Sequence, residues 1–151
     1  MNIKIKKLHP DAIVPQYQTA GAACFDFHAI NRLARHVDSG FPETFDTGLA
    51  FEIPEGHVML IFSRSGHGFN KDVRLANCVG IIDADYRGEV KVKLTCDKEH
   101  DHPLPVQFGD RIAQGIVIPF PRVHFVVADE LTDTARGTNG FGSTDKKNGD
   151  A

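Results

Sequence analysis

Hydrophobic and polar residues alternate along several short stretches of this chain, a pattern typical of β-strands with one buried face. The clearest case begins at Gly88, after which Val90, Val92 and Leu94 fall on one side and polar or charged residues fall between them. We therefore predict a strand over residues 88–96 that turns one face to the core and the other to water.

Five further segments have the composition and the turn-flanked boundaries of short strands. They span residues 3–8, 48–53, 57–62, 111–118 and 123–127. The turn residues 54–56 predict a hairpin between the second and third of these segments. Because the chain is rich in Phe and β-branched residues and its turn signals are closely spaced, the pattern favours an all-β sandwich or barrel. Residues 30–37 have the apolar spacing of a helix two turns long.

The segment 80–89 links an apolar run over residues 77–82 to the alternating strand that follows. Its position predicts that residues 83–87 lie at or near the turn of a β-hairpin. Turn preference accounts for Asp and Gly in such a place, but not for the adjacent Tyr86 and Arg87. A carboxylate, an aromatic ring and a guanidinium so close together indicate a candidate site.

Length and charge narrow the classes of protein to consider. A chain of 151 residues suits one domain, which at this size buries roughly two-thirds of its unfolded surface. The formal net charge is −3 and no basic stripe is present, which argues against a nucleic-acid partner. A small anionic ligand remains compatible, because a few local Arg and backbone N–H groups are enough to hold one.

The cysteines and the N-terminal segment bear on the compartment. Cys24, Cys78 and Cys96 are an odd set without CxxC spacing, which argues against a disulfide framework and against structural zinc. Residues 1–8 alternate Ile and Lys where a signal peptide has an unbroken apolar run, and no segment approaches membrane-spanning length. We therefore expect a cytoplasmic protein that does not associate with a membrane.

Two glycine-rich segments carry groups that suit phosphate. Residues 63–68 follow a predicted strand and can open a short helical turn, which would aim N–H groups, a hydroxyl and the Arg64 guanidinium at one place. Residues 136–144 place Phe141 between glycines, with Arg136 before it and two hydroxyls after it. If this tail folds over a ligand, Phe141 can stack on a base, a contact worth about 1–3 kcal/mol. The alternatives are a solvated turn for the first segment and a flexible terminus for the second.

Two polar residues interrupt otherwise apolar strands. Gln114 lies within the segment 111–118, and Asp26 lies between two Phe residues. Each fits a ligand site, but each also fits the outward face of an amphipathic strand, which is the commoner situation for such residues.

In their order and internal spacing, the segments around Asp26, Arg64, Asp83, Gln114 and Phe141 resemble the trimeric deoxyuridine triphosphatase (dUTPase) family over nearly the whole chain. The resemblance implies a distorted β-barrel of jelly-roll type over residues 1–133. It also implies a homotrimer with shared active sites, over which a mobile C-terminal arm, residues 134–151, closes. The implied reaction is Mg²⁺-assisted hydrolysis of dUTP to dUMP and pyrophosphate, which limits uracil incorporation into DNA and supplies dUMP for dTMP synthesis.

The resemblance also implies roles for individual residues. Asp83 would orient the water that attacks the α-phosphorus, and Asp26 would hold Mg²⁺ through water. The expected phosphate contacts are Arg64, Ser65, Gly66, Gln114, Arg136, Gly142, Ser143 and Thr144. The expected base and sugar contacts are Asn77, Gly80, Ile81, Ile82, Tyr86 and Phe141, among which the Tyr86 ring would exclude a 2'-hydroxyl. Cys24 and Ser63 depart from the Gly and Pro that the family usually has at these positions.

Two other functions stay open. A dCTP deaminase shares this fold and needs a proton-shuttling carboxylate beside the base amine. The arrangement of Asp83 and Tyr86 resembles the hydrolase instead, and ammonia release from dCTP would discriminate the two. A regulatory binder would use nucleotide to gate contact with a protein partner, although the sequence offers no extra domain or long insertion for such a partner.

Overall fold

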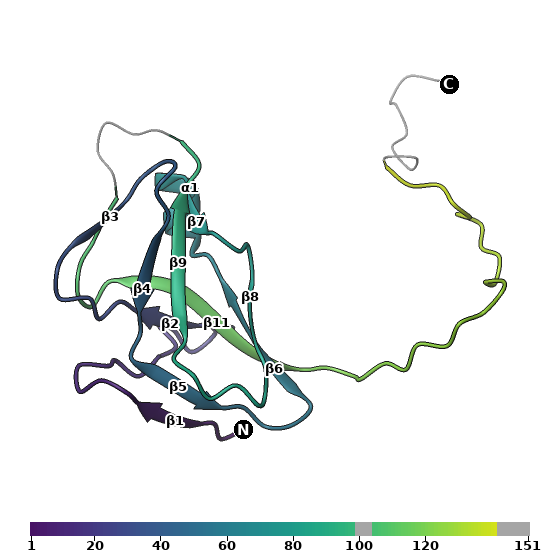
Figure 1. Cartoon of the computed structure of the whole chain (residues 1–151), viewed down its shortest axis with the longest axis horizontal. Coiled ribbons are helices and arrows are strands. Elements are labelled where there is room, and N and C mark those ends of the chain that lie inside the picture. Colours follow the sequence, from purple (N-terminus) through teal and green to yellow (C-terminus); the bar gives the residue numbers. More distant parts are fainter. Residues whose placement is uncertain (99–103, 142–151) are drawn as a thin grey trace.

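The computed structural model describes residues 1–98 and 104–141, which form short β-strands and one helix (Figure 1). In chain order the elements are β1 (Lys4–Lys7), β2 (Phe25–His28), β3 (Arg35–Val37), β4 (Glu43–Asp46), β5 (Leu49–Glu52), β6 (His57–Phe62), α1 (Ser65–Lys71), β7 (Val73–Leu75), β8 (Gly80–Ile82), β9 (Lys91–Cys96), β10 (Leu104–Val106) and β11 (Arg111–Pro119). None of the described residues forms a helix long and apolar enough to cross a membrane.

The strands form two larger antiparallel sheets and two strand pairs. One sheet has the order β2-β11-β6-β8 and the other β4-β9-β7, while β1 pairs with β5 and β10 with β3. Both larger sheets contribute to a single core, in which Phe27 and Met59 from the first meet Phe45 and Leu94 from the second. Burying such a side chain contributes about 1.5–3 kcal/mol, so this shared core holds the sheets together.

The strongest sequence patterns predicted their strands well. Strand β6 spans the predicted residues 57–62, and β1, β5 and β11 lie within about one residue of the predicted segments. Strand β9 begins at Lys91 rather than at the predicted residue 88, but within it Val92, Leu94 and Cys96 are buried while Lys91 and Lys93 are exposed, as the alternation predicted. Local composition and flanking turns were sufficient for these short strands, although β1 is exposed throughout and only β9 alternates regularly between buried and exposed residues.

The predicted helix over residues 30–37 is wrong. Residues 35–37 form β3, which pairs with β10, and Ile30 N–H donates instead to the Asp46 carbonyl. Ile30 and Val37 are buried, whereas Leu33 is 82% exposed, so the apolar residues do not share a face. A helix of two turns is marginal by itself, and pairing with distant strands overrides it.

Both predicted hairpins are also wrong, although both turns are present. His57 N–H donates to the Pro54 carbonyl at 3.2 Å, yet β5 pairs with β1 while β6 pairs with β11 and β8. Tyr86 N–H donates to the Asp83 carbonyl at 3.2 Å, yet β8 pairs with β6 while β9 pairs with β4 and β7. Each turn therefore carries the chain from one pairing unit to another, and the local sequence does not encode the partner strand.

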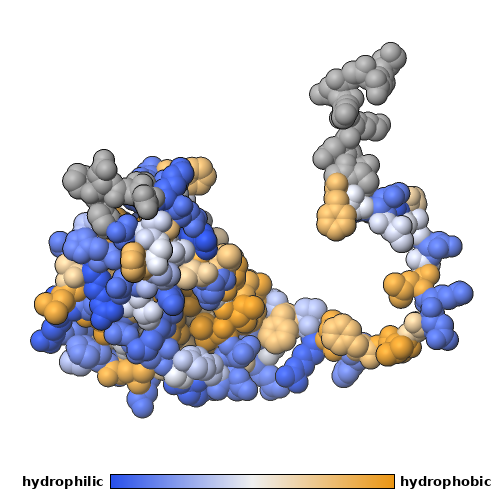
Figure 2. Space-filling view, turned by 45° about the horizontal axis from the view of Figure 1, so that its top comes forward, coloured by the Kyte–Doolittle hydropathy of each residue, from blue (hydrophilic) through white to orange (hydrophobic). Residues whose placement is uncertain are grey.

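The predicted strand over residues 123–127 is absent as well. After β11 the chain leaves the body of the molecule as an extended segment (Figure 1). Apolar side chains stand along this segment in Figure 2, and Phe125 and Val127 are 94% and 99% exposed. No strand of the described part pairs with these residues, so their alternating pattern finds no sheet within one chain.

Candidate functional site

Three charged side chains and an amide meet where β2, β6 and β11 lie side by side. We call Asp26, Arg64, Arg111 and Gln114 the arginine cluster. The Arg64 Nε atom lies 3.3 Å from Asp26 Oδ1, and Arg111 Nη1 lies 3.2 Å from Asp26 Oδ2. Arg64 also donates to the Arg111 carbonyl at 2.8 Å, which ties the N-cap residue of α1 to the first residue of β11.

Asp26 does not have the exposed position that an amphipathic strand would give it. It is 8% exposed and lies directly across from Gln114 in the register of β2 and β11. Burial of a carboxylate is costly unless it is paired, and the two guanidiniums supply that pairing. The cluster holds two positive charges and one negative charge, so it can accept an anion.

A hollow opens beside this cluster at the start of α1. Its volume is about 360 Å³, and it is lined by Ser63, Arg64, Ser65, Gly68, Phe69 and Gln114. Gln114 Nε2 donates to the Ser63 carbonyl at 2.9 Å, which leaves its Oε1 atom as an acceptor. The structure therefore brings together Arg64, Ser65 and Gln114 as the sequence predicted, with Gly66 on the same helical turn.

Two histidines near the arginine cluster add no positive charge to it. Burial lowers the pKa of His28; Asp26 opposes this shift, whereas Arg111 and Arg64 reinforce it. Burial also lowers the pKa of His67, and Arg64 adds to that effect. Both rings are therefore neutral at neutral pH. The anion-binding charge of the cluster is that of its two arginines.

The described residues contain no group of three or more His, Cys, Asp or Glu side chains that could hold a metal ion. Asp26 offers carboxylate oxygens, but two guanidiniums already face them. Mg²⁺ prefers oxygen ligands and commonly keeps waters and substrate phosphates among them. The cluster is therefore compatible with Mg²⁺ if phosphate oxygens and water supply most of the ligands.

A second group of predicted residues, which we call the β8 group, lies in and around β8 and consists of Asn77, Gly80, Ile81, Ile82, Asp83 and Tyr86. Strand β8 is the last strand of its sheet, and it pairs with β6 on one side only. A hollow of about 380 Å³ is lined by Asn77, Gly80, Ile81 and Ile82 together with residues of β6, β7 and β9. The outer edge of β8 therefore presents backbone donors and acceptors to a ligand, as edge strands do.

Asp83 and Tyr86 border an adjoining hollow of about 340 Å³, which shares Ile81 and Ile82 with the first. Asp83 is exposed, and within the described part of the chain its carboxylate has no hydrogen bond or ion pair. Tyr86 is 44% exposed, and its hydroxyl donates to the Glu89 carbonyl at 3.1 Å. A carboxylate open to solvent and a hydrogen-bonded aromatic ring thus lie just after the end of β8 and share a hollow with its residues Ile81 and Ile82.

The structure does not bring the predicted site residues into one place. The arginine cluster and the β8 group line separate hollows on one chain. Arg136 and Phe141 lie on the segment that runs away from the body in Figure 1, and Phe141 is fully exposed. Gly142, Ser143 and Thr144 lie outside the described residues.

Sequence reasoning missed Arg111 as a member of the cluster. It stands at the start of a strand, where an exposed Arg is unremarkable, and its pairing with Asp26 spans 85 residues. The signal that could have found it is its position three residues before Gln114, near the end of the sheet where Asp26 was already a candidate.

Replacing Asp26 by Asn tests how the cluster is held. The amide keeps the side-chain size but leaves two guanidiniums without their counterion, and hydrogen bonds to charged groups contribute about 1.5–3 kcal/mol. Because both arginines are partly solvated, we expect the free energy of unfolding to fall by about 1–3 kcal/mol in urea titrations. Asp97→Asn breaks a more exposed pair with Arg74 and is the matched control, expected to cost less than about 1 kcal/mol. Equal losses in the two variants would show that the pairing of Asp26 contributes no more to the free energy of unfolding than an exposed ion pair does.

Comparisons with known proteins agree with this geometry. The model of the dUTPase family matches residues 10–145. The chain is 41% identical over 146 residues to the deoxyuridine 5'-triphosphate nucleotidohydrolase of Nautilia profundicola, covering 97% of this chain and all of that protein. It is 43% identical to the enzyme of the same name from Helicobacter hepaticus over 145 residues, covering 95% of this chain and 89% of that protein.

Solved structures show the same fold. A mutant dUTPase of Staphylococcus bacteriophage 80alpha with bound dUpNHpp superposes with a TM-score of 0.81 at 22% identity, covering 95% of this chain and 98% of that chain. A mutant dUTPase from phage phi11 of S. aureus, described with a structural Mg(II) ion, superposes with a TM-score of 0.73 at 19% identity, covering 86% and 98%.

Proposed function

The chain belongs to the dUTPase family and hydrolyses dUTP, and from this premise we propose how its residues divide the work. The observation that carries the proposal is the solvent-facing Asp83 and the fixed Tyr86 ring beside the open edge of β8. The β8 group binds the deoxyuridine, and the arginine cluster and the C-terminal arm bind the triphosphate.

The open edge of β8 is the proposed reader of the base. Uracil presents alternating donors and acceptors, which main-chain groups from Gly80 to Ile82 can match, with Asn77 at the side of the same hollow. Cytosine exchanges a donor for an acceptor and would leave buried groups unpaired, a penalty of about 1–3 kcal/mol for each unmatched group. The methyl group of thymine would clash with the residues that line this hollow. Phe141 of the arm is proposed to stack on the base.

Asp83 is the proposed general base. Hydrolysis at the α-phosphorus needs a water in line with the departing pyrophosphate, and a positioned carboxylate can orient that water and accept its proton. Its exposure at the end of β8 leaves room for such a water.

Charge neutralisation is the proposed work of the arginine cluster and the arm. Arg64, Ser65, Gly66 and Gln114 bind phosphate oxygens, and Arg136, Gly142, Ser143 and Thr144 add contacts from the arm. Asp26 would hold Mg²⁺ through water, and the ion would supply a Lewis acid for the phosphates.

A homotrimer with shared sites is part of the proposal. Its support is that one chain holds the arginine cluster and the β8 group in separate hollows, while residues 123–131 run away from the body with five large apolar side chains exposed, a surface that a second copy could cover. Residues 1–133 then form the barrel, and residues 134–151 form the arm that closes over a neighbour's site. Sedimentation equilibrium tests this assembly, because a trimer has three times the 16.6 kDa mass of one chain.

Substrate selectivity tests the proposed function. Purified protein with Mg²⁺ is given dUTP, dCTP, dTTP and UTP in parallel, and pyrophosphate and ammonia release are measured. We expect pyrophosphate from dUTP alone and ammonia from none. Equal cleavage of dTTP would contradict base reading by β8, and ammonia from dCTP would reassign the protein as a deaminase. The proposal includes a cytoplasmic location, where a free nucleotide pool is the substrate, and neither nucleic acid nor a membrane as a partner.

Replacing Tyr86 by Ala tests sugar selection. Without the ring, the 2'-hydroxyl of a ribonucleotide has room, so the ratio of kcat/KM for dUTP to kcat/KM for UTP is expected to fall by about tenfold or more, equivalent to about 1.4 kcal/mol. Tyr17→Phe, which alters the other tyrosine of the chain, is the control and should leave the ratio unchanged. A wild-type ratio in Tyr86→Ala would place sugar selection elsewhere.

A further inference from the structure

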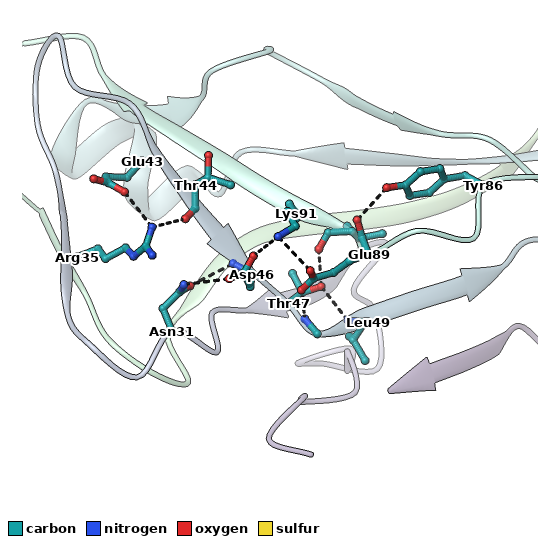
Figure 3. A network of polar contacts seen from close by, with 12 residues as sticks. Asn31, Arg35, Glu43, Thr44, Asp46, Thr47, Leu49, Tyr86, Glu89 and Lys91 are labelled. Atoms are coloured by element: carbon teal, nitrogen blue, oxygen red, sulfur yellow. Dashed lines mark hydrogen bonds and ion pairs between the residues drawn. The ribbon is translucent and has the colours of Figure 1, made fainter. Parts of the chain in front are cut away.

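The Tyr86 ring folds back over the backbone of the residues that follow it. A Cβ atom at Gly88 would lie 2.6 Å from Tyr86 Cζ and 3.0 Å from Cε2, so only glycine leaves room for the ring there. The Tyr86 hydroxyl then donates to the Glu89 carbonyl at 3.1 Å (Figure 3). The ring therefore lies over Gly88, and its hydroxyl is held by the Glu89 carbonyl.

The side chain of Glu89 fixes that backbone in turn. Its Oε1 atom accepts a hydrogen bond from Gly48 N–H at 2.8 Å, and its Oε2 atom lies 3.2 Å from Lys91 Nζ. Lys91 Nζ also lies 2.6 Å from Asp46 Oδ1, so Glu89 is one member of the connected network in Figure 3. Its side chain is only 21% exposed, which makes these bonds stronger than those of a fully solvated pair.

The backbone around Gly48, to which the Glu89 side chain is hydrogen-bonded, is held rigidly. Thr47 is 1% exposed and donates its hydroxyl proton to the Val90 carbonyl at 2.6 Å, while Val90 N–H donates to the Leu49 carbonyl at 2.9 Å. Gly48 lies between them with a positive φ of 66°, and a Cβ there would lie 2.7 Å from Ile30 Cδ1. The corner between β4 and β5 is thus part of the core, and Glu89 ties the turn that carries Tyr86 to it.

We propose that Glu89 is a positioning residue for sugar selection: by bridging Gly48 N–H and Lys91, its carboxylate holds its own carbonyl where the Tyr86 hydroxyl needs it. The inference rests on the proposed function, since it assumes that the Tyr86 ring excludes a 2'-hydroxyl. A ring that excludes one hydroxyl group must be held to a fraction of an ångström, because a ring free to tilt leaves room for that group.

The position of Tyr86 can be measured without any enzymatic activity. The chain has two tyrosines and no tryptophan, so in a Tyr17→Phe background Tyr86 is the only strong fluorophore. We expect iodide to quench its emission at least twofold more efficiently in Glu89→Ala than in the background protein. Glu89→Gln keeps an acceptor for Gly48 N–H and should remain close to the background. Glu43→Ala, which removes a carboxylate paired with Arg35 in the same region, is the matched control. Unchanged quenching in Glu89→Ala would overturn the proposal.

Selectivity then decides whether positioning serves the reaction. Glu89→Ala should lower the dUTP to UTP ratio of kcat/KM by about three- to tenfold, a change of about 0.6–1.4 kcal/mol. The double variant with Tyr86→Ala should show no further loss, because both changes act through one ring. Additive losses, or an equal loss on both substrates, would overturn the proposal. Increased quenching with a wild-type ratio in both Glu89→Ala and Tyr86→Ala would instead refute the proposed role of Tyr86 and leave the positioning in place. Should Glu89→Ala fail to fold, Glu89→Asp is measured instead. Its side chain is shorter by one methylene group, so its carboxylate does not reach Gly48 N–H.

Discussion

Replacing Asp83 by Asn is expected to lower kcat for dUTP by about 10²–10⁴-fold, the usual contribution of a positioned general base. The amide has the size of the carboxylate but cannot accept the proton of the attacking water. In the described part of the chain the Asp83 carboxylate takes part in no ion pair or hydrogen bond, and only its backbone carbonyl holds the turn. The variant should therefore fold as the wild type does and still bind dUTP with an affinity within a few-fold of wild type.

Pyrophosphate release measures the first expectation and calorimetric titration with dUpNHpp measures the second. Asp85→Asn is the control, because Asp85 is also an exposed carboxylate of the same turn and lies outside the hollow that Asp83 shares with Tyr86. Its turnover should stay near wild type. If Asp83→Asn keeps near-normal turnover, or if both variants lose it equally, the general base is another group.

The strands that the sequence predicted well are those whose pattern is local. Strand β9 shows the period of two over its full length, and a single buried face is enough to produce it, whereas β6 is a short apolar run that its flanking turns mark as a strand. Partner choice is a different matter. Nothing within residues 54–56 or 83–87 shows that the next strand joins another pairing unit, because the pairing depends on which edges the rest of the chain leaves open.

The same contrast holds for the site. Tyr86 and Asp83 were identifiable because they lie three residues apart in a segment that carries more functional groups than a turn requires. The burial of Asp26 was not identifiable, since it depends on Arg64, which precedes α1, and on Arg111, which begins β11. Segments 30–37 and 123–127 were misjudged for a related reason. Each has a clear local pattern, but the first finds a strand partner and the second finds no partner within one chain.

That second segment leads to the prediction for the C-terminal arm. Deleting residues 134–151 is expected to lower kcat/KM for dUTP by about 10²-fold or more, since stacking on one base contributes about 1–3 kcal/mol and phosphate contacts add to it. The midpoint of thermal unfolding should stay within about 2 °C of wild type, a shift that corresponds to less than about 1 kcal/mol for a chain of this size. Arg136 and Gly137 make their described hydrogen bonds to Thr134 and Asn139, all within the arm itself.

Pyrophosphate release and differential scanning calorimetry measure the two effects, and Phe141→Ala separates stacking from the remaining contacts. That single change should cost roughly 5- to 150-fold in kcat/KM, which corresponds to about 1–3 kcal/mol. A midpoint that collapses on truncation would make the arm a structural element. A large loss of activity without loss of stability would support the proposed closure of the arm over a site. Residues 134–141 run away from the body of the free chain, so on closing they would lose freedom and gain contacts with bound substrate.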